Sequence, residues 1–343
     1  MSIEKKIFGT YGGEKVFAYR LTNKKGSSVT ILNYGGIIQS LVVPDKNGKF
    51  GDVVCGFDTV EDYIADRASY TGSLVGRCGN RISGGGFRIG KKFYSVASNE
   101  AGRGHLHGGN VGFNRKIWKV KTRSGNGSDS LFLSLFSPDM EEGYPGNLEV
   151  KVKYTFADDD SLEIKYEAKT DADTYINLTN HAYFNLNGYD GGSVMDQKLK
   201  IEADYYDDVD EALIPKDKPA SVEGTSFDFR RLRKISGPYD HNFHINGAAK
   251  TGALRHGVTY KDPGSGRRMD VYTDLPCVQL YTAVGMDGPT KFKGGVPQRK
   301  LHALCLETQN PPDLPNRKSL KQRFTRAGRK YRSTTKYVFG IEK

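Results

Sequence analysis

The sequence predicts an all-β protein that forms one continuous domain. Apolar and polar residues alternate through residues 148–154 and 162–166, the pattern of strands with one buried face and one face in water. The turn residues 156–161 separate the two segments, so we expect an antiparallel pair. The 343 residues contain no fixed-period repeat, low-complexity segment or flexible linker, and one large β domain over residues 1–343 is the simplest organisation.

The N-terminal part shows the same β pattern. Between Val16 and Val43, short apolar runs are separated or followed by the turn segments 23–28 and 45–48, which favour hairpin connections. One short helix is expected near residues 59–66, because Asp58-Thr59-Val60-Glu61 has the spacing of a helix N-cap with a carboxylate reaching back.

Two further segments are expected to contribute to the core. Leu131, Leu133 and Leu135 alternate with Phe132 and Phe136, which predicts a strand covered on both faces. The single tryptophan is expected to be a core residue, although a platform that stacks on a sugar is the alternative for Trp118.

The composition is typical of a soluble protein with reduced cysteines. No apolar run approaches the roughly 20 residues that cross a bilayer, and no apolar stretch of a secretory signal follows the charged N-terminal segment. The cysteines are scattered and form no CxxC pair or disulfide framework: Cys55, Cys78, Cys277 and Cys305. We therefore expect free thiols, a cytoplasmic location and no membrane partner.

The net charge of +11 could indicate an anionic partner. However, the basic residues often occur singly on alternating strand positions, as Lys151 and Lys153 do beside Glu149. The densest basic tract, residues 317–332, has no recognisable nucleic-acid-binding module. We therefore expect a solvated basic surface and no nucleic-acid partner.

Glycines flank an Asn-Arg pair in residues 76–87. A phosphate-binding loop is disfavoured, because the spacing is neither GxGxxG nor GxxxxGK[ST] and no helical pattern follows. The alternative is that glycine lets the backbone turn tightly while Asn80 and Arg81 direct their side chains at a ligand.

Two histidines of the segment His-Leu-His-Gly-Gly would point the same way in a strand, and such a pair can bind metal. No carboxylate follows within a few residues, and no CxxC or HExxH motif supplies further ligands. We therefore expect no metal, and a structural histidine bonded to the backbone is the alternative reading for His105 and, less so, for His107.

The segment 177–186, Asn-Leu-Thr-Asn-His-Ala-Tyr-Phe-Asn-Leu, places His181 among amides on an otherwise apolar stretch. Burial would leave these polar groups without partners unless other residues or a ligand met them, so the segment fits the wall of a cleft. With a pKa near about 6.5, histidine exchanges protons close to neutral pH.

A carboxylate that could face this histidine lies in the expected strand 301–307. Ala303, Cys305 and Glu307 share one face of that strand, and small neighbours leave room for a ligand beside the carboxylate. Asn310-Pro311-Pro312-Asp313 ends the strand. A single glutamate at a strand end is otherwise a surface residue. Asp240, next to a histidine, fits a surface ion pair and a hydroxyl acceptor in a cleft equally well.

Taken together, these clusters resemble the galactose mutarotase (aldose 1-epimerase) family. The matching segments follow family order over nearly the whole chain: 76–82, 105–109, 142–148, 177–186, Asp240, Gln279 and 306–309. The resemblance implies a large antiparallel β-sandwich of the galactose mutarotase-like (supersandwich) type, with few short helices and an open cleft. It also implies interconversion of the α and β anomers of free hexoses such as galactose and glucose, without a metal or organic cofactor.

By the matched positions, Glu307 would be the general base and His181 the general acid. The sugar would be held by Asn80, Arg81, His107, Asp240 and Gln279. Opening a pyranose ring takes a proton from the C1 hydroxyl and delivers one to the ring oxygen, so an acid and a base on opposite sides of the sugar suffice. We expect Glu307 to begin ionised and His181 protonated, because their mutual attraction favours both charges. Arg81 and His107 could steady negative charge on oxygen.

The segments 326–331 and 284–300 depart from the family pattern and affect the rim of the cleft, not the acid and base. Two other functions remain open. The basic charge balance favours an enzyme for hexose 6-phosphates, and a non-catalytic sugar-binding regulatory protein could share the same fold. The oligomeric state is expected to be a monomer or a weak homodimer.

Overall fold

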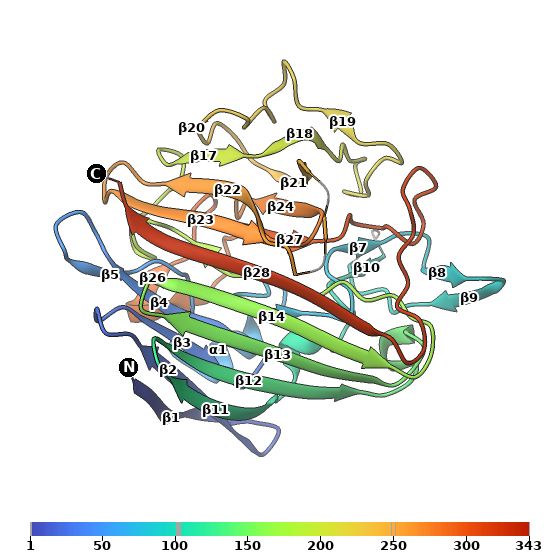
Figure 1. Ribbon diagram of the computed structural model, residues 1–343, viewed down its shortest axis with the longest axis horizontal. Helices are drawn as coiled ribbons and strands as arrows, with labels where there is room; N and C mark the ends of the chain where they lie inside the picture. The colour runs from blue at the N-terminus through green and yellow to red at the C-terminus, as the bar shows by residue number, and fades with distance from the viewer. Residues whose placement is uncertain (1, 101–103, 248, 251, 343) are drawn as a thin grey trace.

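The computed structural model describes residues 2–100, 104–247, 249–250 and 252–342. A nine-stranded antiparallel sheet crosses the front of the molecule (Figure 1), with β28 beside β14 at its centre. Its strands, in spatial order, are β11 (Lys119–Gly125), β12 (Ser128–Ser137), β13 (Leu148–Ala157), β14 (Ser161–Thr170), β28 (Lys330–Ile341), β23 (Arg267–Thr273), β22 (Arg255–Lys261), β17 (Lys198–Ile201) and β20 (Arg233–Lys234).

Two further sheets lie behind the first (Figure 1). The six-stranded sheet has the order β16 (Tyr183–Phe184), β27 (Leu304–Gln309), β24 (Cys277–Tyr281), β21 (Asp240–Ile245), β18 (Ala203–Tyr206) and β19 (Ala220–Ser221). The five-stranded sheet has the order β1 (Ser2–Tyr11), β2 (Glu14–Thr22), β3 (Ser28–Leu32), β4 (Ile38–Pro44) and β5 (Phe50–Asp52).

Short elements complete the described chain. Four two-stranded ladders pair β6 (Leu74–Val75) with β15 (Thr179–Asn180), β7 (Arg81–Ile82) with β10 (His105–Leu106), β8 (Gly86–Ile89) with β9 (Lys92–Ser95), and β25 (Lys291–Phe292) with β26 (Val296–Pro297). Helical turns are α1 (Val60–Ala65) and the 3-10 segments η1 (Phe113–Arg115), η2 (Glu141–Gly143) and η3 (Lys293–Gly295).

The main hydrophobic core lies between the sheets, which confirms the predicted β-sandwich. It joins Tyr154 and Ile164 of the front sheet to Leu304 and Leu306 of the six-stranded sheet. Alternation in β13 and β14 produces this core, because every second residue is buried while residues such as Lys151 remain exposed. Trp118 belongs to the same core, as expected.

The prediction that residues 131–136 would be covered on both faces was wrong. Leu131 and Leu133 are buried, but Phe136 on the other face is 58% exposed. The front sheet is covered on its inner face, and Phe136 on the outer face of β12 is exposed to solvent. Period-2 alternation of two apolar sets therefore did not distinguish a doubly covered strand from one with an exposed aromatic face.

The one predicted α-helix is present as α1. Thr59 is its N-cap, and the Thr59 hydroxyl accepts a hydrogen bond from the backbone N–H of Asp62 at 3.1 Å. The helix buries Val60 and Tyr63. Both predicted hairpin turns are also present, because residues 23–27 connect β2 to β3 and residues 45–49 connect β4 to β5.

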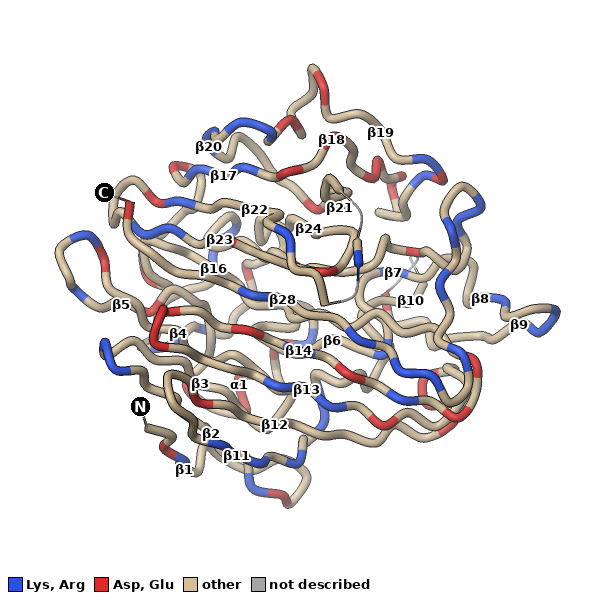
Figure 2. Tube along the Cα trace, in the orientation of Figure 1, with Lys and Arg blue, Asp and Glu red and all other residues tan. Residues whose placement is uncertain are grey.

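Charged residues of both signs are interspersed along the strands, and lysines and arginines recur along the segment that enters β28 (Figure 2). Most of that basic tract is exposed, but Arg317 is only 3% exposed and forms an ion pair with Asp207 at 2.8 Å. The expectation of a solvated basic surface was therefore wrong for Arg317. Among the described residues, no helix is long and apolar enough to span a membrane.

Arg77 anchors the glycine-rich segment that the sequence singled out. Its buried guanidinium donates to the carbonyl oxygens of Pro138 and Gly146 at 2.7 and 2.8 Å, and its Nε donates to Ser137 Oγ at 2.8 Å. Because Arg77 lies three residues before Asn80, this bonding fixes the approach of the chain to the cleft described below. Nothing in the sequence distinguished Arg77 from the other residues of this segment.

Replacing Arg77 by methionine is expected to lower the free energy of unfolding by about 3 kcal/mol or more, because several buried carbonyls would lose their donor. Urea denaturation measures the change. Arg88→Met, at an exposed position of β8, is the control and should stay within about 0.5 kcal/mol of the wild type. Equal stability of the two variants would contradict the anchoring role.

Candidate active site

A cavity of about 320 Å³ opens beside the six-stranded sheet. Pockets that bind small molecules commonly begin near this size, so a monosaccharide is the appropriate scale of ligand. Six of the seven predicted site residues line it: Asn80, Arg81, His107, His181, Asp240 and Glu307. The structure therefore brings together residues that are up to 227 positions apart in the chain, from Asn80 to Glu307.

Strand pairing explains why these residues meet. In the six-stranded sheet, β27 lies between β16 and β24, and Glu307 is directly opposite Gln279. Asp240 begins β21, next to β24 on its other side. His181 lies just before β16, whose Tyr183 is paired with Cys305 of β27. Neighbouring strands of one sheet thus place the histidine, the glutamate and the aspartate along one wall.

The loops on the opposite wall are held by a close approach of two glycine segments. Gly108 has a φ of +92°, and a Cβ added there would lie 1.9 Å from the carbonyl oxygen of Gly76. Only glycine fits this position. Asn80 and His107, with φ of 64° and 51°, also have left-handed backbones, which direct their side chains into the cavity.

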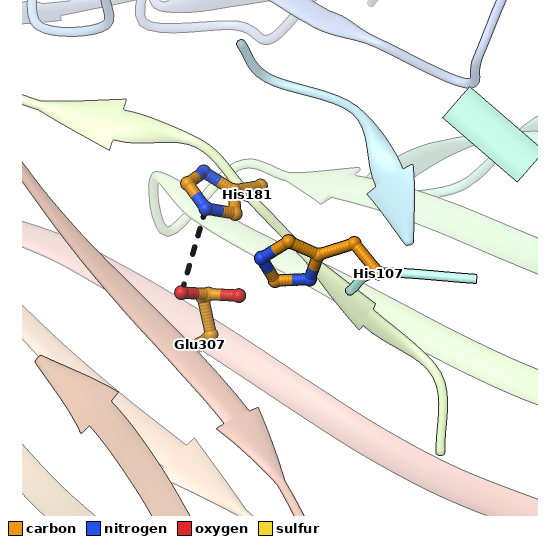
Figure 3. Close-up of side chains that lie close together, drawn as sticks. All are labelled: His107, His181 and Glu307. Carbon is orange, nitrogen blue, oxygen red and sulfur yellow. Dashed lines mark ion pairs between the residues drawn. The ribbon is translucent and has the colours of Figure 1, made fainter. Parts of the chain in front are cut away.

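His181 and Glu307 form a close pair in this cavity (Figure 3). Nε2 of His181 lies 3.6 Å from Oε1 of Glu307, and the side chains are 6% and 2% exposed. This separation is too long for a direct hydrogen bond. Oε2 of Glu307 is buried and has no hydrogen-bond partner among the described residues. A substrate hydroxyl in the cavity would satisfy this oxygen.

The pair lies on one wall rather than on opposite sides of a sugar-sized gap, which corrects the expected arrangement. The chemical reason is that the C1 hydroxyl oxygen and the ring oxygen of a pyranose are bonded to the same carbon. An acid and a base that serve these two oxygens must therefore be neighbours, and the 3.6 Å separation meets that requirement.

Burial sets the proton distribution of the pair. Burial lowers the pKa of His181 to about 4, and it raises the pKa of Glu307 well above its ordinary value. The charge of Asp240 raises the pKa of Glu307 further, while Arg81 opposes this shift. Burial therefore opposes the expectation that mutual attraction keeps both groups charged. It favours a neutral His181 with the exchangeable proton on Glu307.

His107 is a fixed hydrogen-bond donor. Its Nδ1 accepts the backbone N–H of Asn80 at 3.1 Å, and its own backbone N–H donates to the Asn80 carbonyl at 3.2 Å. Burial, together with the neighbouring His181 and Arg81, lowers the pKa of His107 well below the ordinary range, so the imidazole is neutral. Because Nδ1 is an acceptor, the proton is on Nε2.

Arg81 is held chiefly by a carboxylate partner. Its Nε and Nη2 donate to the two carboxylate oxygens of Glu100 at 2.8 Å each. Nη1 remains for the cavity and lies 3.7 Å from Oδ2 of Asp240. This bidentate pairing fixes the plane of the guanidinium.

Gln279 is the one predicted site residue that does not line the cavity itself. It lines a narrow adjoining hollow together with Asn80, Arg81 and Asp240, and its Nε2 donates to Oδ1 of Asp240 at 2.6 Å. Gln279 therefore orients Asp240, and it reaches the cavity through this aspartate.

Comparison with known proteins identifies the family of this chain. The sequence model of the family described as aldose 1-epimerase matches residues 18–338. The chain belongs to the aldose 1-epimerase family. Relatives include the galactose mutarotase of Bos taurus, 38% identical with 99% of each chain covered, and the aldose 1-epimerase of Escherichia coli (strain K12), 34% identical with 94% of each chain covered.

Solved structures show the same family fold. The GalM/aldose epimerase homologue from C. elegans superposes with a TM-score of 0.86 at 32% identity, covering 94% of this chain and 98% of that chain. The galactose 1-epimerase from Lactobacillus acidophilus NCFM has a TM-score of 0.84 at 25% identity, covering 100% and 99%.

The aldose 1-epimerase cavity contains three groups that could be taken for a metal site. Each of these groups offers one ligand atom, and the three atoms lie within 4.8 Å of one another: His107, His181 and Glu307. A neutral histidine binds a metal through an unprotonated nitrogen, and in His107 that nitrogen already accepts the Asn80 N–H. The donor set therefore fits a transition metal poorly, and a metal-free site stays our prediction.

His105 is a structural residue in this member of the family. It is buried, its Nδ1 contacts the Ala97 carbonyl at 2.7 Å, and its Nε2 contacts the Tyr144 hydroxyl at 2.6 Å. The alternative reading of a structural histidine is confirmed here.

Three cavity residues carried no recognised sequence signal. Tyr70 has its ring 4.6 Å from that of His107, Tyr281 borders the cavity beside His181, and Glu100 holds Arg81. Isolated tyrosines and a loop glutamate occur throughout this chain, so the sequence could not distinguish these three from surface or core residues.

Two larger hollows, of about 910 and 860 Å³, border the front sheet and share Asp274 and Arg332. Among the described residues that line them there is no histidine. They therefore lack the buried acid and base that the smaller cavity contains.

Glu307→Gln is expected to stabilise the protein at pH 8 and much less at pH 4. In the folded protein the pKa of Glu307 is raised above its ordinary value of 4.5. The unfolded chain therefore ionises first, and stability is lost as pH rises from there towards the folded pKa. An uncharged glutamine removes this loss of stability. Each gain of about 1 kcal/mol in the free energy of unfolding corresponds to a rise of roughly 2–4 °C in Tm. Thermal unfolding at the two pH values measures it.

The control is Glu149→Gln, at an exposed position of β13. A pH-dependent gain of the same size in this variant would contradict the explanation from burial.

Proposed function

We propose that this chain is an aldose 1-epimerase, an isomerase that interconverts the α and β anomers of free hexoses such as galactose and glucose. The observation that carries the proposal is the buried pair of His181 and Glu307, which holds one exchangeable proton in a monosaccharide-sized cavity. The full-length similarity to galactose mutarotases supports the same activity.

The reaction needs two proton transfers at neighbouring oxygens. Glu307, once ionised, removes the proton of the C1 hydroxyl, and His181 delivers a proton from Nε2 to the ring oxygen. The bond between C1 and the ring oxygen breaks, and the C1 oxygen becomes an aldehyde carbonyl. After rotation about the C1–C2 bond the transfers reverse, and the ring closes on the other face. Each transfer can contribute about 10²–10⁴-fold to the rate.

The proton count of the pair is the same in both halves of this cycle. Before opening, Glu307 is ionised and His181 is protonated; after opening, Glu307 holds the proton and His181 is neutral. Burial favours the second distribution in the ligand-free cavity. Hydrogen bonds from sugar hydroxyls would favour the ionised carboxylate, so binding would move the pair towards the first.

The remaining residues are proposed to hold the sugar. Asp240 accepts hydroxyl protons in the orientation that Gln279 fixes. His107 donates through Nε2 to negative charge that develops on oxygen, and Nη1 of Arg81 does the same. Asn80 adds an amide at the same wall. These groups suit neutral hydroxyls, which need several convergent hydrogen bonds.

An enzyme for hexose 6-phosphates is less well supported. A phosphate calls for at least two converging basic side chains. Among the described residues that line the cavity, Arg81 is the one arginine or lysine. Two nitrogens of its guanidinium already bind the carboxylate of Glu100. A non-catalytic sugar-binding protein is also less well supported, because both members of the acid–base pair are in place. A cytoplasmic location and a monomer or weak homodimer complete the proposal.

Glu307→Ala and His181→Ala are each expected to lower the rate of mutarotation by about 10²–10⁴-fold, measured by polarimetry on freshly dissolved α-galactose and α-glucose. His256→Ala, at a partly exposed position of the front sheet, is the matched control and should keep the wild-type rate. Glucose 6-phosphate should react more slowly than glucose. Wild-type rates in both site variants, or a strong preference for the phosphorylated sugar, would refute the assignment.

The pH dependence of kcat/KM is expected to be a broad bell. Below about pH 4, His181 of the free enzyme gains a proton while Glu307 keeps its own, so the site has no base. At the alkaline limb Glu307 loses its proton while His181 is neutral, so the site has no acid; this limb lies above the ordinary pKa of a glutamate. Stopped-flow polarimetry between pH 3.5 and 9 would measure both limbs, where roughly tenfold changes per pH unit are expected. A flat profile would contradict a one-proton pair.

A further inference from the structure

The second ring nitrogen of His181 has a partner that the proposed mechanism has not yet used. Nδ1 lies 3.4 Å from Sγ of Cys305, a side chain that is 0% exposed. This thiol is the one side-chain hydrogen-bond partner of Nδ1 among the described residues. The backbone of His181 itself also interacts with the ring and raises its pKa, against the effect of burial.

One strand supplies the partners of both nitrogens. Cys305 and Glu307 are two residues apart on β27, so their side chains leave the same face at points roughly 6.6 Å apart. That spacing matches an imidazole lying across the strand, with Nδ1 over Cys305 and Nε2 over Glu307. The pairing of Tyr183 with Cys305 fixes this arrangement, because His181 lies two residues before Tyr183.

The other titratable groups around the ring do not replace this contact. They are His107, whose ring centroid lies 5.2 Å away, and the tyrosine rings of Tyr183, Tyr70 and Tyr281 at 5.0, 6.0 and 6.2 Å. These rings pack against the imidazole, while Glu307 faces Nε2. Among these side chains, the sulfur of Cys305 is therefore the one that can orient the ring by a hydrogen bond at Nδ1.

We propose that Cys305 is a positioning residue, whose sulfur accepts the Nδ1–H of His181 and so leaves Nε2 as the nitrogen that exchanges the proton. The proposal rests on the proposed function and deepens it. During ring opening the Nε2 proton passes to the ring oxygen as the bond between C1 and the ring oxygen breaks. The neutral imidazole that remains is protonated at Nδ1. The hydrogen bond to Cys305 therefore persists through both halves of the cycle.

A second histidine of the same chain also has a thiol at Nδ1, but it has a carboxylate within hydrogen-bond distance of Nε2 as well. His244 lies 3.6 Å from Cys277 through Nδ1, and its Nε2 lies 2.9 Å from Oδ1 of Asp207. Burial alone would lower the pKa of His244, but Cys277 and Asp207 raise it to about 10. Such a histidine stays charged at neutral pH and could not release its proton in each turnover.

Cys305 can orient the imidazole of His181 without fixing a charge on it. Burial, with the nearby charge of Glu307, raises the pKa of the Cys305 thiol well above its usual range, so the sulfur stays neutral. A neutral acceptor holds the ring in place while leaving His181 free to gain and lose its proton. Sulfur is a weak acceptor, which suits a partner that must not stabilise the imidazolium strongly.

The test compares three variants at two equivalent positions. Cys305→Ala removes the acceptor and is expected to lower kcat roughly tenfold with KM little changed, because the ring loses its orientation and not its substrate contacts. Cys305→Ser restores a polar partner and should recover most of kcat. Cys277→Ala, equally buried on the neighbouring strand β24, controls for the loss of packing and should keep kcat near the wild-type value.

The second measurement needs no activity. In ligand-free protein labelled with ¹⁵N-histidine, the ¹⁵N shifts of His181, assigned by their loss in His181→Gln, should show a neutral ring protonated at Nδ1 in the wild type and in Cys305→Ser. In Cys305→Ala that preference should be lost. A wild-type ring protonated at Nε2, or unchanged kcat and tautomer in Cys305→Ala, would overturn the proposal, as would equal losses of kcat and Tm in the two alanine variants.

The two readouts separate the proposals from each other. A wild-type protein without mutarotase activity would overturn the proposed function, and the tautomer measurement would still decide whether Cys305 holds Nδ1 of His181.

Discussion

The constraint on which the rest of this structure depends is the burial of a carboxyl and an imidazole at 3.6 Å from each other. Taking either charge out of water is costly, so the pair is tolerated as a neutral unit that holds one proton. A small change in free energy, such as that of hydrogen bonds to sugar hydroxyls, is enough to move the proton between the two groups. Its geometry must nevertheless be kept within a few tenths of an ångström, and that requirement explains why the site lies on paired strands.

The supporting structure consists of short, fully bonded links between the segments that carry the site. Glu142 accepts the backbone N–H groups of Asn110 and Val111, which ties η2 to the loop after His107. Arg77 ties the segment before Asn80 to the carbonyls around Pro145. These bonds replace the regular ladders that the irregular loops lack, and they hold the loop wall of the cavity against the sheet wall.

Much of the fold and of the site could be predicted from local pattern. Alternation in β13 and β14, the turns of both N-terminal hairpins and the cap at Thr59 are short-range features, so the sequence displays them directly. The order of motifs predicted which residues meet in the cavity. Three features could not be predicted: that Phe136 is exposed, that Arg317 is buried, and that Gln279 lies behind Asp240. The first and the third depend on what packs over a strand face, whereas Arg317 lies outside the strands and pairs with a distant aspartate.

The sequence by itself determined the β architecture, the family and the set of polar residues at the site, because these depend on side-chain period and motif identity. The tertiary structure alone decided the protonation of the pair, the fixed tautomer of His107 and the neighbour of each nitrogen of His181. The physical reason is that a pKa or a tautomer is set by burial and by atoms a few ångströms away. For His181 those atoms belong to residues more than a hundred positions away, and for His107 they belong to Asn80, 27 positions away.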